Sequence, residues 1–122
     1  MPKYVSFFSY TAEAWSRMVA APENRGLAAR KLIEEAGGRM ETFYWMLGDW
    51  DGLVIYEVDD VATATAVSGR VTSSGLVKAI KTHALISADE AREGLDKARA
   101  MGPAYAPPGQ HGEWFAEYGL LA

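Results

Sequence analysis

The side chains best suited to acid–base chemistry are those of His83 and Lys81, which lie two residues apart. Histidine titrates near neutral pH, so His83 could act as a general base or ligate haem iron. Residues two apart on a strand share a face, so Lys81 could anchor the carboxylate of a ligand beside it. A hydrogen-bonded histidine and a solvated edge lysine are the structural alternatives. His83 is the first catalytic candidate, and Lys81 is a candidate for substrate binding.

A second group is acidic. Asp49 and Asp51 flank Trp50 within a predicted turn over residues 48–52. Two carboxylates so placed could supply a general base or bind a cation through oxygen. Aspartate in a turn more often accepts hydrogen bonds from nearby backbone N–H groups. Asp51 is therefore a weaker catalytic candidate than His83.

Composition excludes several classes of chemistry. The chain has no cysteine and only two histidines, which rules out thiolate chemistry and leaves little for a metal site. Neither a glycine-rich phosphate loop nor a G-x-S-x-G elbow occurs. The net charge of −4 argues against a nucleic-acid partner. We expect no metal, no cofactor and no membrane partner, and a cytoplasmic location, because no long apolar segment is present.

The elements that must position these residues follow from length and periodicity. A chain of 122 residues is one domain's worth of polypeptide, and 49% hydrophobic residues suffice for a core. The patterns predict strands at 3–10, 39–47, 53–58 and 76–86, a helix over 11–36 broken near Pro22, a helix over 61–72, and a last helix started by the capping box of Ser87 and Glu90.

This order is β-α-β-β-α-β with an extra C-terminal helix and tail, which is typical of a ferredoxin-like α+β fold. We expect one domain over residues 1–101. Residues 102–122 carry three prolines and several aromatic side chains. A disordered tail is normally poor in aromatics, so we expect this extension to dock on the domain or on a partner subunit.

The predicted hairpin shows which side chains share a face of the sheet, because alternate strand residues point to opposite sides. Pairing of Leu47 with Gly52 separates an aromatic set from an aliphatic set. The aromatic set is Phe43, Trp45, Val54 and Tyr56, joined by Tyr4, Phe8 and His83, and the aliphatic set is Met40, Tyr44, Met46, Leu53 and Ile55. We expect the aliphatic set under the helices and the aromatic set on the uncovered face. A shift of one residue in register reverses this assignment.

An uncovered aromatic face is too apolar for a soluble monomer, so we expect two sheets to face each other in a dimeric α/β barrel. The aromatic side chains would then be dimer core, or they would line a pocket for a small molecule, either between sheet and helices or between subunits.

Three stretches resemble the GYD family of small bacterial proteins: residues 1–11, residues 37–48 from Gly37-Gly38 through Phe43-Tyr44-Trp45-Met46-Leu47-Gly48, and the turn Gly48-Asp49-Trp50-Asp51. The turn is similar to the G-x-Y-D signature of the family, with Trp50 where tyrosine is usual. The resemblance covers about residues 1–92. It implies a ferredoxin-like fold related to the dimeric α/β-barrel proteins, and it implies no particular activity.

The resulting hypothesis is a homodimeric protein that binds a small molecule. As an enzyme it would be a cofactor-free monooxygenase, isomerase or cyclase for an apolar or aromatic substrate, with His83 as base. Substrate would contact Phe8, Phe43, Trp45, Tyr56 and Lys81. The alternative is a non-catalytic module that binds a metabolite or regulates a partner.

Overall fold

The structure is a computed structural model that describes residues 1–109. The chain forms two compact units, Met1–Leu85 and Ile86–Ala122, and each is described by itself. The first unit contains every predicted site residue.

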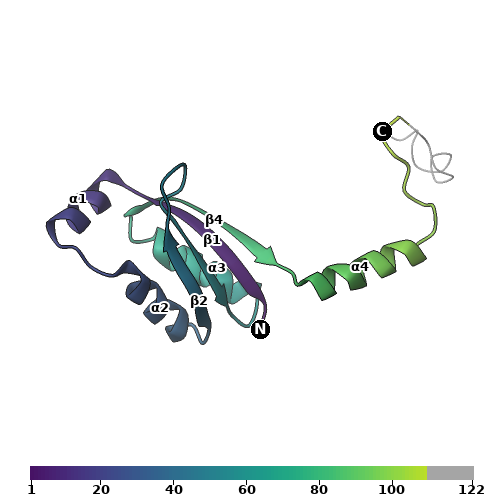
Figure 1. The fold of residues 1–122 in the computed structure, drawn as a ribbon, viewed down its shortest axis with the longest axis horizontal. Coiled ribbons are helices and arrows are strands. Elements are labelled where there is room, and N and C mark those ends of the chain that lie inside the picture. The colour runs from purple at the N-terminus through teal and green to yellow at the C-terminus, as the bar shows by residue number, and fades with distance from the viewer. Residues whose placement is uncertain (110–122) are drawn as a thin grey trace. The chain divides into compact units, whose positions relative to one another are not determined.

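The first unit is built on one antiparallel sheet (Figure 1). Its strands are β1 (Lys3–Tyr10), β2 (Arg39–Trp45), β3 (Gly52–Glu57) and β4 (Val77–Leu85), arranged in the order β2-β3-β1-β4. The helices between them are α1 (Ala12–Ala20), α2 (Arg25–Glu35) and α3 (Val61–Thr72). The predicted ferredoxin-like order is confirmed, with β1 and β3 at the centre of the sheet.

The first crossover is divided into two helices, as the sequence predicted. Thr11 caps α1 by accepting from the backbone N–H of Ala14, and Asn24 caps α2 by accepting from Leu27. Pro22 lies in the connection, two residues before the second cap. The break separates α1 from α2, and side chains of both helices line the same cavity, which is described below.

Gly38 allows α2 to turn closely into β2. A β-carbon built on Gly38 would meet the backbone oxygen of Glu57 and the Val58 side chain. The preceding Gly37 has φ +83°, a left-handed conformation that glycine adopts at low cost. The pair therefore ends the helix as predicted and also permits close backbone contact with β3.

The β2–β3 hairpin differs from prediction in two ways. Its strands pair Trp45 with Gly52 and Phe43 with Val54, so the loop spans residues 46–51. This is a two-residue change from the expected register, which preserves the grouping of side chains by face. A bulge between Met40 and Thr42 then moves Met40 to the face of Phe43.

The assignment of the two faces is reversed relative to the prediction. The helix-covered core contains Tyr4, Phe8, Val54 and Tyr56, packed against Ile33 of α2 and Ala64 and Val67 of α3, with Phe43 beside them. The aromatic set thus lies under the helices, with the exception of His83, which pairs with Val5 and shares the uncovered face with it. Both faces of β1 and β3 carry large apolar side chains, so hydrophobicity alone could not choose between them.

In the second unit, helix α4 (Ala88–Ala100) begins at Ser87. The predicted capping box is present: Glu90 N–H donates to the Ser87 hydroxyl, and the Glu90 carboxylate accepts from Ser87 N–H. The predicted docking of the tail falls largely on residues outside those described, and it stays a prediction. No helix within residues 1–109 is long and apolar enough to cross a membrane.

Candidate functional site

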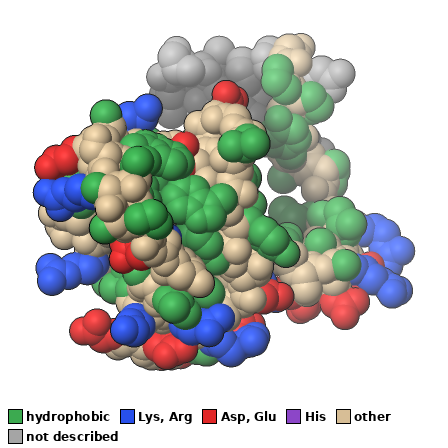
Figure 2. All heavy atoms as spheres, turned by 60° about the vertical axis from the view of Figure 1, so that its left-hand side comes forward, with side chains coloured by type: hydrophobic (Ala, Val, Ile, Leu, Met, Phe, Trp, Pro, Cys, Tyr) green, Lys and Arg blue, Asp and Glu red, His purple; other side chains and the backbone are tan. Residues whose placement is uncertain are grey.

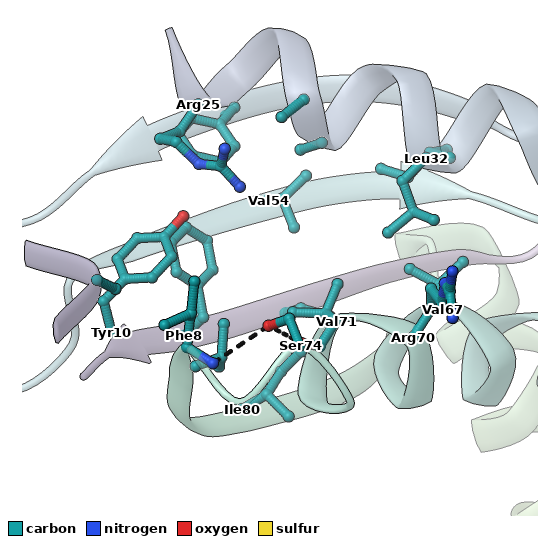
Figure 3. A pocket seen from close by; sticks show the side chains of 18 of the residues that line it. Phe8, Tyr10, Arg25, Leu32, Val54, Val67, Arg70, Val71, Ser74 and Ile80 are labelled. Carbon is teal, nitrogen blue, oxygen red and sulfur yellow. Dashed lines mark hydrogen bonds between the residues drawn. The ribbon is translucent and has the colours of Figure 1, made fainter. Parts of the chain in front are cut away.

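A cavity of about 410 Å³ lies between the helix-covered face of the sheet and helices α1, α2 and α3. Its volume is within the range of ordinary small-molecule sites, about 300–1,000 Å³. Most of its wall is apolar, and Figure 3 shows side chains from β1, β3, α2 and α3 converging on it. Three predicted binding residues, Phe8, Phe43 and Tyr56, line this cavity.

Five aromatic rings form a connected cluster, and three of them line the cavity. Phe8 lies 5.5 Å from Phe43 and 5.4 Å from Tyr10 between ring centroids. Trp45 lies 5.7 Å from Tyr10 and 5.5 Å from Trp15. Ring pairs at these separations contribute about 0.5–1.5 kcal/mol each beyond their area burial. The cluster therefore forms an aromatic wall that joins β1, β2 and α1.

Trp15 and Trp45 form the outer side of this wall, at 41% and 44% exposure. Trp45 does not line the cavity itself, unlike the other predicted aromatic contacts. Figure 2 views the molecule from the side of α1, where hydrophobic side chains gather at the surface among charged ones.

The floor of the cavity carries a short chain of hydroxyl groups. The Ser6 hydroxyl lies 3.3 Å from the Tyr56 hydroxyl and 2.7 Å from that of Thr82, which lies 3.3 Å from the Ser68 hydroxyl. Ser6 and Tyr56 are 3% and 1% exposed and both line the cavity. Each buried hydroxyl thus has a partner, and the pair presents one polar spot in an apolar surface.

Arg25, the first residue of α2, brings a charge to the cavity. Its Nη1 donates to Glu23 Oε1 over 2.8 Å, and its side chain is 32% exposed. Burial opposes the charge, but the Tyr10 hydroxyl and the Glu23 carboxylate outweigh it and raise the pKa of the guanidinium. Figure 3 shows Arg25 extending from α2 toward Tyr10.

The charged lining is mainly positive. Arg17, Arg25 and Arg70 line the cavity against the single carboxylate of Glu23. Arg17 also pairs with Glu13 over 2.9 Å, whereas Arg70 has no ion-pair partner within residues 1–109.

Asp51 fastens the β2–β3 loop to the end of β1. Its Oδ2 accepts from the backbone N–H of Tyr10 over 2.8 Å and from Trp15 Nε1 over 3.3 Å. Its own N–H donates to the Phe8 carbonyl over 2.9 Å. These bonds give Asp51 a structural task at the aromatic wall, and its catalytic role stays a prediction.

His83 and Lys81 lie on the uncovered face, across the sheet from the cavity. In β4 they pair with Val5 and Phe7, whose side chains alternate with the cavity-lining residues of β1. The centroid of the Phe7 ring lies 6.4 Å from that of His83 and 6.2 Å from that of Trp50. The sheet therefore separates His83 from the cavity that Phe8, Phe43 and Tyr56 line, and a catalytic role for His83 stays a prediction.

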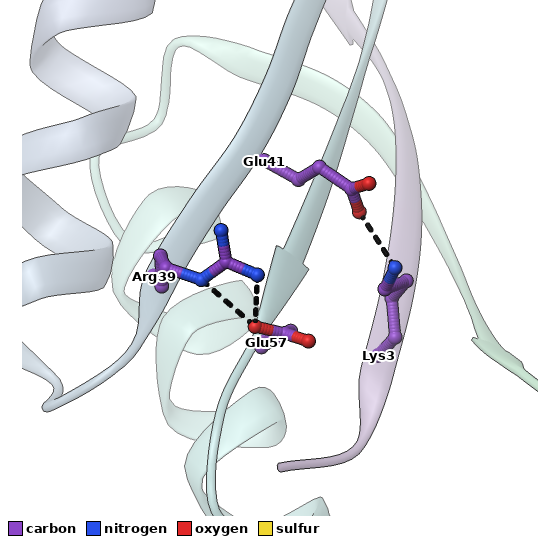
Figure 4. Close-up of polar contacts among 4 residues, drawn as sticks. All are labelled: Lys3, Arg39, Glu41 and Glu57. Carbon is purple, nitrogen blue, oxygen red and sulfur yellow. Dashed lines mark hydrogen bonds and ion pairs between the residues drawn. The ribbon is translucent and has the colours of Figure 1, made fainter.

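The rim of the uncovered face carries two ion pairs (Figure 4). Lys3 contacts Glu41 at 2.9 Å, and Arg39 contacts Glu57 at 2.6 Å. Hydrogen bonding to Arg39 holds the pKa of Glu57 below its ordinary value. These exposed pairs mark the β2 edge of this face and lie outside the cavity.

Sequence reasoning missed the polar residues of the site, among them Ser6, Tyr10 and Arg25. The first two share the strand parity of Phe8, so their position followed from the correct assignment of the covered face. Nothing local separates Arg25 from other surface arginines, since only the folded crossover brings it over the sheet. No cluster of residues suited to holding a metal ion occurs in the part of the chain that the structure describes.

The fold and the cavity define a class: a ferredoxin-like α+β domain with an apolar, arginine-bearing space between sheet and helices. The model of the GYD domain matches residues 4–95, so the chain belongs to the GYD domain family. The predicted resemblance is confirmed over nearly the same span.

No curated protein matches the chain. Among solved structures, one described as "crystal structure of FFRP-DM1" is similar, with a TM-score of 0.45 and 15% identity over 70% of this chain and 100% of that chain. A likeness at this level carries no argument about function.

Proposed function

We propose that the protein binds an apolar or aromatic small molecule in the cavity between its sheet and its helices. The observation that carries the proposal is a space of about 410 Å³ whose floor and walls are mostly apolar, with a few convergent polar groups. This combination is typical of ligand sites, whereas a packed core leaves few voids larger than a water molecule.

Binding has more support than catalysis by His83. A ligand in the cavity contacts Phe8, Phe43 and the hydroxyls of Ser6 and Tyr56, all on the covered face. A general-base role for His83 would instead need a ligand on the uncovered face, beside Lys81 and Phe7. A cofactor-free reaction inside the cavity would have to use its own groups, such as the Tyr56 hydroxyl.

The test is to fill the cavity from α2. Ala29 lines it, and Ala29→Phe adds a ring into the empty space. The expected result is loss of binding of 2-naphthamide, a neutral aromatic probe, by at least about tenfold in calorimetric titration, with the melting temperature maintained. Ala62→Phe is the matched control, because Ala62 is exposed on α3 and does not line the cavity. Equal binding by both variants, or no binding by the wild-type protein, would refute the proposal.

We further propose that a second copy of this chain covers the uncovered face. On this face Val5 and Phe7 of β1 pair with Ile55 and Leu53 of β3. Tyr44 of β2, which pairs with Leu53, is 62% exposed. An apolar sheet face of this kind is typical of an interface, and a second copy offers the same surface to a two-fold axis. The rim pairs of Figure 4 would then border the interface.

A further inference from the structure

We infer that the ligand of the cavity carries a carboxylate, which Arg25 binds together with the Tyr10 hydroxyl while the apolar body of the ligand lies against Phe8 and Phe43. This inference rests on the proposed function and adds to it the chemical class of the ligand. Neither the family nor the comparisons assign this site.

The position of Arg25 supports an acidic partner inside the cavity. Arginine side chains usually extend into water, but this one is two-thirds covered and lines an apolar space. Covering a guanidinium is costly unless acceptors meet its donors. Figure 3 shows it turned toward Tyr10, so a carboxylate bound at the guanidinium would also lie near the Tyr10 hydroxyl.

Glu23 does not use up the hydrogen-bonding capacity of Arg25. The contact is a single bond from Nη1 to Oε1, and the Glu23 side chain is 56% exposed. A guanidinium has five N–H donors in a planar fork, so several remain for a second acceptor. A carboxylate matches this fork with two parallel bonds.

The surrounding charge also favours a monoanion. Three arginines and one glutamate line the cavity, although the whole chain carries a net charge of −4. Walls of low dielectric strengthen the field of such a local excess. A cationic ligand would meet repulsion here. A phosphate dianion would need a second cation as close to the ligand as Arg25.

The hydroxyls of Ser6 and Tyr56 add a second recognition point. They lie on the cavity floor, and Arg25 comes from the helices above the sheet. A ligand with its acid at Arg25 could therefore place one polar atom near Tyr56, with apolar atoms between. Val54, which lines the cavity from β3, suits that middle part.

The test compares an acid with its neutral isostere. Calorimetric titration of the wild-type protein with 2-naphthoate and with 2-naphthamide should show tighter binding of the acid by at least about tenfold. Arg25→Gln should abolish this preference while 2-naphthamide still binds. Arg30→Gln should keep it, because Arg30 is exposed on the same helix and does not line the cavity. Tyr10→Phe should weaken the preference by a few-fold.

The outcomes separate this inference from the proposed function. If the wild-type protein binds acid and amide equally, or if Arg25→Gln leaves the ratio of their affinities unchanged, the inference of a carboxylate ligand is wrong. The proposal of a binding cavity is then unaffected. Failure of both probes to bind overturns both. The wild-type ratio and Tyr10→Phe still decide the matter if Arg25→Gln does not fold.

Discussion

At the scale of single residues, Asp51 shows how one side chain of the family signature serves the site. It is the last residue of the loop before β3, and its carboxylate holds the Tyr10 backbone and the Trp15 indole. Those two residues belong to the aromatic wall, so the loop and the wall are tied together. Trp50, the residue before Asp51, packs instead on Phe7 of the uncovered face.

Replacing this carboxylate should be costly. Asp51→Ala leaves the part-buried N–H of Tyr10 without its acceptor, and we expect a loss of about 1–3 kcal/mol in the free energy of unfolding. Urea denaturation measures it. Asp49→Ala is the control, because Asp49 is exposed, and it should change stability by no more than about 0.5 kcal/mol. Equal effects of the two substitutions would contradict a structural task for Asp51.

At the scale of elements, local sequence patterns determine where helices begin and end. Thr11, Asn24 and Ser87 each cap a helix through a side-chain oxygen. Asp60 caps α3 through Thr63, and this hydrogen bonding lowers the pKa of its carboxyl group. Such signals act over three or four residues, so they can be identified without knowledge of the fold.

The junction between α2 and β2 allows a prediction about Gly38. Gly38→Ala would place a methyl group against the Glu57 backbone oxygen, and we expect a destabilisation of at least about 1–3 kcal/mol. Gly69→Ala is the matched control: Gly69 lies within α3, and the added carbon meets nothing within 4 Å apart from the neighbouring residues and backbone of its own helix, so the change should stabilise by about 0.5–1 kcal/mol. Thermal melting of both variants measures the sign of each change in stability. No loss of stability in Gly38→Ala would argue against the close approach of Gly38 to β3.

At the scale of the whole molecule, the uncovered face should determine assembly. Phe7→Lys places a charge at the centre of this face, opposite Leu53 in β3 and Lys81 in β4. We expect the wild-type protein to be a dimer, or a multiple of one, in native mass spectrometry, and we expect this variant to be a monomer, because a buried unpaired charge opposes association. Val61→Lys, on an exposed position of α3, should leave the mass unchanged. A monomeric wild-type protein would refute the interface.

The sequence by itself determined the fold class, the order of the elements, the capping box that starts the last helix and the grouping of side chains on the hairpin. These depend on short-range preferences and on the two-residue period of strands. The two-residue change in hairpin register left the grouping of Phe43 with Val54 and Tyr56 intact for that reason.

Only the tertiary structure decided which group the helices cover, where the cavity lies and that Arg25 reaches it. The helices choose a face through long-range packing of Ile33 and Val67, and both faces of β1 offer apolar side chains. Arg25 is separated from Phe43 and Tyr56 by 18 and 31 positions along the chain. No local sequence pattern predicts that these residues line one cavity, since this arises only when separate elements pack on one sheet.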